Sequence, residues 1–173
     1  SLPVTEPKTL SYPVWSDARQ HLSELPSVDS DGTNSIEFLK SVNAILKNTP
    51  FELAFRALNE LLLAVISTQP KDDIELYAVW DDFLMCKVLP RIEGDTDKLG
   101  HEPSLLEKLA KLLEISFAEF WDKQDGEDDA RPDLYQEKIT GDDKAVRIKC
   151  RSKAKLEWMQ KRLNDSSFTS FWP

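Results

Sequence analysis

Residues 73–88, DIELYAVWDDFLMCKV, carry the hydrophobic pattern that decides the fold. Apolar side chains recur at helical spacing on more than one side of this stretch. A helix that is apolar on several sides is packed by several neighbours. We therefore expect a central helix here, with Asp72 or Asp73 as its N-cap and Pro90 marking its end.

Four further stretches place apolar residues at helical spacing on one side. We expect the second of them to bury Phe51 and Phe55, and Ser152 to cap the last. Glu93-Gly94-Asp95 has the residues of a turn. The expected helices run from near Ser35 to the turn at Asn48-Thr49-Pro50, from about Pro50 to Ser67, from near Pro103 (with Ser104 as a cap) to about Lys123, and from Lys153 to Leu163.

This order predicts an all-α fold, a helical bundle of four to five main helices with an acidic loop and a short C-terminal extension. We expect a Pro- and turn-rich lead-in with a short helix over residues 1–34 and the bundle over 35–121. The acidic loop then spans 122–142, and a basic helix with an aromatic tail spans 143–173.

The composition sets the class of protein. The chain has 173 residues, 40% of them hydrophobic, which is enough for one domain with a core. Its longest apolar run, Leu61 to Ile66, is far short of a membrane helix. Two cysteines are too few for a disulfide scaffold, so we expect a cytoplasmic protein without a membrane partner. Because the chain begins with Ser1 and not Met, we expect a piece of a longer protein.

The net charge of −9 is unevenly distributed. Residues 1–142 carry 14 basic and 28 acidic groups, whereas residues 143–173 carry 8 basic and 3 acidic groups. The acidic body argues against broad nucleic-acid binding, because phosphate contacts need Lys and Arg. In the basic tail, Lys149, Arg151 and Lys153 are candidates for contacting phosphate or an acidic partner. The alternative is that they pair with the acidic body of this chain.

The last residues, SFTSFWP, hold three aromatic side chains. Burying a large aromatic side chain against other apolar groups is favourable compared with leaving it in water. We expect Phe168, Phe171 and Trp172 to dock on the helices as an aromatic anchor. The same segment is also a candidate docking surface for a partner.

The sequence contains no signature of catalysis. It lacks G-x-x-x-x-G-K-[ST] and G-x-G-x-x-G, so we expect no phosphate loop. His21 and His101 are the only histidines and lie far apart, which predicts no metal site. Cys150 lies between Lys149 and Arg151, which could lower its pKa, but no His is nearby in sequence. We therefore expect no catalytic residue, and a free-standing enzyme is a weak hypothesis.

Three segments resemble a known family. FRALNEL at 55–61 has an R-x-x-N-E pattern, residues 74–99 contain KVLPRIEG, and SLLEKL follows at 104–109. This order resembles the C-terminal lid of McrB-like AAA+ NTPases, the motors of modification-dependent restriction systems. The tail from Ser152 is similar to the end of some bacterial members. The resemblance covers about residues 35–113 and the last twenty-odd residues; residues 1–34 and 122–150 have no counterpart.

The resemblance implies a lid that senses nucleotide and helps ring assembly in a DNA restriction and phage-defence motor. Arg56 would be a second-sensor arginine, since a guanidinium can form two hydrogen bonds to phosphate oxygens. The alternative is a local ion pair of Arg56 with Glu52 or Glu60. Asn59 and Glu60 would lie near the ring interface.

The resemblance also implies partners and cofactors. They are an AAA+ core upstream in the same chain, neighbouring ring subunits and a McrC-like nuclease, with DNA bound only through the assembly. GTP or ATP with magnesium would belong to the parent protein and no cofactor to this fragment. The other open hypothesis is a stand-alone helical module that binds a protein partner.

Overall fold

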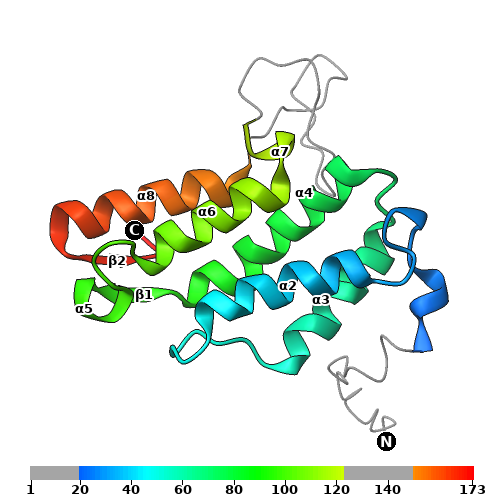
Figure 1. Ribbon diagram of the computed structural model, residues 1–173, viewed down its shortest axis with the longest axis horizontal. Helices are drawn as coiled ribbons and strands as arrows, with labels where there is room; N and C mark the ends of the chain where they lie inside the picture. Colours follow the sequence, from blue (N-terminus) through cyan, green and yellow to red (C-terminus); the bar gives the residue numbers. More distant parts are fainter. Residues whose placement is uncertain (1–19, 123–149) are drawn as a thin grey trace, which may run out of the picture.

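The computed structural model describes residues 20–122 and 150–173 (Figure 1). The fold is an all-α bundle with one small two-stranded sheet, which confirms the expected fold class. Residues 1–19 of the expected lead-in and 123–142 of the expected acidic loop lie outside the described residues. Within the described ranges the long helices are α2 (Thr33–Leu46), α3 (Phe55–Thr68), α4 (Asp73–Phe83), α6 (Leu105–Phe117) and α8 (Arg151–Ser166).

Helix α4 is the centre of the bundle, as its apolar pattern predicts. It contacts α3 on one side and α8 and the short α7 (Glu119–Asp122) on another, while α6 packs on both α2 and α8 (Figure 1). Its buried residues lie on several sides of the helix. The Asp72 carboxylate accepts a hydrogen bond from the backbone N–H of Glu75 at 2.8 Å, so Asp72 is the N-cap.

Stacked aromatic rings join the helices inside the core. The Phe38 ring of α2 stacks on Trp80 of α4, with centroids 4.3 Å apart and planes 5° from parallel. Phe117 at the end of α6 lies 5.8 Å from Phe38 and meets Phe120 of α7 edge to face at 5.5 Å. Each such pair adds about 1 kcal/mol beyond the area that it buries. The cluster therefore ties α2, α4, α6 and α7 together.

A buried carboxylate organises the start of α2. Asp29 accepts hydrogen bonds from the backbone N–H of Asn34 at 2.9 Å and of Ser35 at 3.1 Å. The Ser35 hydroxyl donates to the same carboxylate and accepts from the Trp80 indole at 2.9 Å. This network satisfies free donors of the first turn and links the turn to α4.

The C-terminal end of α4 widens into η3, a π-helix over Leu84–Val88. The backbone N–H of Leu89 donates to the carbonyl of Leu84, five residues earlier. In a regular α-helix, the Pro90 ring would clash with the carbonyl of Cys86. The wider turn relieves this clash, so Pro90 accounts for both the π-helix and the end of the helical stretch in η4 (Leu89–Arg91).

Helix α3 begins at Phe55 and not at Pro50 as expected. The Asn43 side-chain oxygen on α2 accepts a hydrogen bond from the backbone N–H of Leu53 at 2.7 Å. This contact holds the chain in a turn before the helix begins. Phe51 is buried in that turn, whereas the Phe55 side chain is 89% exposed. The prediction that Phe55 lies in the buried stripe is wrong.

The helix expected from Pro103 to Lys123 is divided in two. Ser104 caps α6 as predicted, since its hydroxyl accepts from the backbone N–H of Glu107 at 3.2 Å. Ala118 has a positive φ of 47°, which ends α6 at Phe117 before α7 continues the chain. The bend lets the α7 aromatics pack against the core.

The chain end forms a strand. β2 (Phe168–Ser170) pairs antiparallel with β1 (Glu93–Asp95), and Gly94 lies opposite Thr169. The expectation of a turn at Glu93–Asp95 is wrong, because these residues find a partner strand at the other end of the chain. The remaining short elements are η1 (Leu22–Glu24), η2 (Ser27–Asp29) and α5 (Thr96–Leu99).

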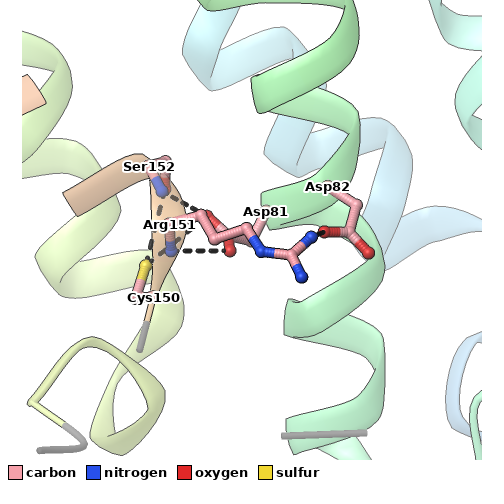
Figure 2. A network of polar contacts seen from close by, with 5 residues as sticks. All are labelled: Asp81, Asp82, Cys150, Arg151 and Ser152. Atoms are coloured by element: carbon pink, nitrogen blue, oxygen red, sulfur yellow. Dashed lines mark hydrogen bonds and ion pairs between the residues drawn. The ribbon is translucent and has the colours of Figure 1, made fainter. Parts of the chain in front are cut away.

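The first turn of α8 is capped by another helix (Figure 2). The Asp81 carboxylate of α4 is fully buried and accepts from the backbone N–H of Ser152 at 2.8 Å and of Arg151 at 3.0 Å. The Cys150 thiol also donates to Asp81, at 3.5 Å. Ser152 was expected to be the cap, but it lies inside the helix. The cap is instead a residue 71 positions away.

Replacing Asp81 will destabilise the fold strongly. Asp81→Ala removes the acceptor of one buried and one part-buried backbone N–H group of α8, at an expected cost of about 3 kcal/mol in the free energy of unfolding. The matched control is Asp82→Ala, which removes a part-exposed ion pair at an expected cost of about 0–1 kcal/mol. Urea denaturation followed by circular dichroism measures both. Equal losses in the two variants would contradict the role given to Asp81.

Candidate functional site

A hollow of about 300 Å³ lies between α3, the end of α4 and η3, and we call it the α3–η3 groove. Its apolar surface comes from Ala64 of α3, Val79 and Phe83 of α4, and Met85 of η3. The exposed Cys86 thiol also lines it. Concave and mainly apolar sites with a few polar groups are where proteins most often bind ligands or partner side chains.

Charged side chains surround this apolar surface. On the α3 side, Glu60 pairs with Arg56 at 3.0 Å and with Lys87 at 3.6 Å. Toward α8, the Arg151 guanidinium pairs with Asp82 at 3.0 Å (Figure 2). All of these side chains are partly exposed, so the pairs contribute little to folding stability. The groove therefore presents both signs of charge at its edge.

The π-helix determines which side chains reach the groove. Met85, Cys86 and Lys87 are consecutive residues, and all three line the hollow. Single π-turns inside helices occur frequently at functional sites. Methionine adapts its shape to different apolar partners, which suits a docking surface. No sequence motif marks these residues as a site; the one available signal is Pro90, four residues after Cys86.

The structure brings three of the predicted site residues together. Glu60 and Arg151 line the groove, and Arg56 is joined to it only through its ion pair with Glu60. The Arg56–Glu60 pair is one of the two local ion pairs that the sequence offered as an alternative to nucleotide sensing. Asn59, the other interface candidate, is fully buried in α3.

Lys153 of the basic tail does not line the groove. The Lys153 ammonium donates to the Trp121 carbonyl at 3.2 Å and lies 3.6 Å from the Asp122 carboxylate. Together with the Arg151–Asp82 pair, this contact is the kind of pairing with the acidic body that the alternative interpretation expected. Lys149 lies outside the described residues.

The aromatic tail is only partly docked. Phe171 is buried, the Lys155 ammonium lies 4.4 Å from its ring centroid, and the same ammonium donates to the Phe171 carbonyl at 3.0 Å. Arg162 donates to the Trp172 carbonyl at 2.6 Å. Yet Phe168 remains 48% exposed and Trp172 62% exposed. Phe171 is thus held in place by α8, while its two aromatic neighbours face solvent.

The two cysteines differ in environment. Burial, and then the negative charge of Asp81, raises the pKa of the Cys150 thiol to about 12. The effect is opposite to the lowering that neighbouring Lys149 and Arg151 could have caused. Cys86 is exposed in the groove. In the described part of the chain, no three His, Cys, Asp or Glu side chains are grouped closely enough to hold a metal ion.

Comparison with known proteins gives a family. Residues 16–168 match the family described as "Domain of unknown function (DUF8727)". The chain belongs to this family. The match begins before α2 and ends at Phe168, the first residue of β2. No curated protein and no solved structure matches the chain. None of the helices between residues 20 and 122 or after residue 149 is long and apolar enough to cross a membrane.

The thiols provide a direct test of this geometry. At neutral pH, a thiol reagent will modify Cys86 and leave Cys150 unmodified, because the buried thiol has a pKa of about 12 and almost no thiolate. Titration with a chromogenic disulfide will show one reactive thiol in the native protein and a second only in denaturant. Cys86→Ser removes the native signal. Two thiols reacting at similar rates in the native protein would contradict the burial of Cys150.

Proposed function

We propose that the domain is a helical protein-interaction module whose α3–η3 groove binds an apolar segment of a protein partner. The observation that supports this proposal is the groove itself, with its apolar surface and partly exposed charges of both signs. An amphipathic helix that inserts apolar side chains into such a groove is a common mode of recognition. The hollow of about 300 Å³ suits one or two inserted side chains.

The charges at the edge would orient the partner. Glu60 already holds two cations, Arg56 and Lys87, so a partner carboxylate can take over one of them without leaving Glu60 unpaired. Arg151 and Asp82 offer a second pair toward α8. Charge complementarity at a rim affects the association rate and specificity more than the affinity. We place this function in the cytoplasm, in keeping with two free thiols.

A photocrosslinker attached to Cys86 tests the groove. The labelled protein is incubated with extract of the source cells, irradiated, and the crosslinked protein is identified by mass spectrometry. Ala64→Arg places a long charged side chain in the groove and should reduce the crosslinked product at least about tenfold. The matched control is Ile115→Arg, which changes an exposed residue of α6 and should leave the product unchanged.

Thermal denaturation is the check that both variants are folded before crosslinking. Equal crosslinking of one protein by the wild type and by Ala64→Arg would overturn the groove as the binding site. Loss in both variants would also count against it, because the effect would then not depend on the groove.

A second candidate is the lid of a McrB-like AAA+ motor, which would contribute nucleotide sensing and ring assembly. It is favoured by the position of Arg56 in the first turn of α3, where the side chain is 48% exposed and its guanidinium is accessible to a phosphate that would compete with Glu60. In this proposal, GTP or ATP with magnesium binds to an AAA+ core in the same chain. Neighbouring ring subunits, a McrC-like nuclease and DNA belong to the complete assembly.

The complete open reading frame tests the lid proposal. A P-loop within about 250 residues before Ser1 would support it, and an open reading frame without one would overturn it. In a full-length protein with that motor, Arg56→Ala should lower nucleotide hydrolysis at least about tenfold. Lys111→Ala, which removes an exposed cation of α6 that lines neither hollow, is the control and should leave hydrolysis unchanged.

A further inference from the structure

A second hollow, separate from the α3–η3 groove, lies between α2 and the turn that precedes α3. Its volume is about 310 Å³, its lining is mainly apolar, and it includes Leu39, Leu53 and Leu58. It shares no lining residue with the α3–η3 groove. Phe55 belongs to its lining and is 89% exposed, so an apolar projection lies directly beside an apolar depression.

The exposure of Phe55 follows from the fold. The turn held by Asn43 delays the start of α3 until residue 55 and places the ring in the first helical turn, outside the core. Large apolar side chains are this exposed in few places of the described chain, and Phe55 is the most exposed of them. Removing an exposed phenyl group from water is favourable. Covering the Phe55 ring would therefore contribute to the binding free energy of a partner.

The same patch carries one cation and one anion. Lys40 and Glu52 both line the hollow. The Lys40 ammonium lies 3.7 Å from the Glu37 carboxylate, with both side chains about two-thirds exposed, so this ion pair is weak and easily exchanged. Glu52 accepts a hydrogen bond from the backbone N–H of Asn48 at 3.1 Å and keeps its second oxygen for another donor.

We infer that this patch is the interface with a second copy of the chain, related by a two-fold axis. A two-fold interface uses the same surface on both subunits, so each contact occurs twice. A two-fold axis that passes between Phe55 and the hollow, and between Lys40 and Glu52, brings each projection to a depression and each cation to an anion. Phe55 of each subunit enters the hollow of the other, and Lys40 of each subunit faces Glu52 of the other.

The patch is small, so the dimer is weak and depends on concentration. We expect a dissociation constant on the order of 10 µM. Sedimentation velocity over a concentration series that brackets this value should show the wild-type protein passing from monomer to dimer. A wild type that remains monomeric at roughly ten times this concentration would overturn the inference.

Phe55→Asp tests the apolar contact. The variant should be monomeric throughout the series, because a carboxylate cannot enter the apolar hollow. Ile115→Asp is the matched control, since Ile115 is 74% exposed on α6 and does not line the hollow. This control should dimerise like the wild type. Dimerisation of Phe55→Asp at wild-type affinity would overturn the inference.

A charge exchange tests the orientation of the two subunits. Lys40→Glu and Glu52→Lys should each weaken the dimer about tenfold, because each places like charges opposite one another twice. The double variant Lys40→Glu/Glu52→Lys should recover most of the wild-type affinity. A double variant that is no better than the single ones would overturn the proposed pairing. Crosslinking from Cys86 in Phe55→Asp reports separately on the α3–η3 groove, so the two proposals fail independently.

Discussion

The buried Asp81 carboxylate, bonded to the first turn of α8, is the contact on which the remaining arrangement depends. A carboxylate in the interior requires donors, and the N-terminus of α8 supplies backbone N–H groups and the positive end of a helix dipole. Because the contact joins α4 to α8, it brings Arg151 next to Asp82 at the groove. It also sets where α8 runs, and α8 in turn holds the chain end through Lys155 and Arg162.

The groove is assembled from three segments that are distant in the sequence. Helix α3 supplies one wall, the widened turn before Pro90 supplies Met85, Cys86 and Lys87, and α8 supplies Arg151. The conformation of each segment is explained by its own local sequence, and no short sequence motif contains residues of all three segments. A search for catalytic or phosphate-binding patterns does not find such a site, because its properties arise from shape and from a mixture of apolar and charged side chains.

The local predictions were the accurate ones. The central position of α4, the Asp72 cap and the Ser104 cap each depend on residues within one or two turns of each other. The wrong predictions concern residues whose conformation depends on a contact with another segment of the chain. The spacing of Phe55 fits the apolar stripe of α3 and predicts a core position, yet the helix starts later because the backbone N–H of Leu53 donates to the Asn43 side chain. The strand at Glu93–Asp95 was missed because its partner is about 75 residues away.

The amino-acid sequence by itself determined the all-α class, the number of long helices and most of their ends, because hydrophobic spacing and capping act between near neighbours. It also supplied Arg56, Glu60 and Arg151 as residues of interest, although for a different reason. Only the tertiary structure decided that Glu60 and Arg151 line one groove, that Asp81 caps α8, and that Phe55 stays in solvent. Each of those outcomes depends on contacts between segments that are far apart in the sequence. The sequence separation of two segments does not say whether they lie close together in the folded protein.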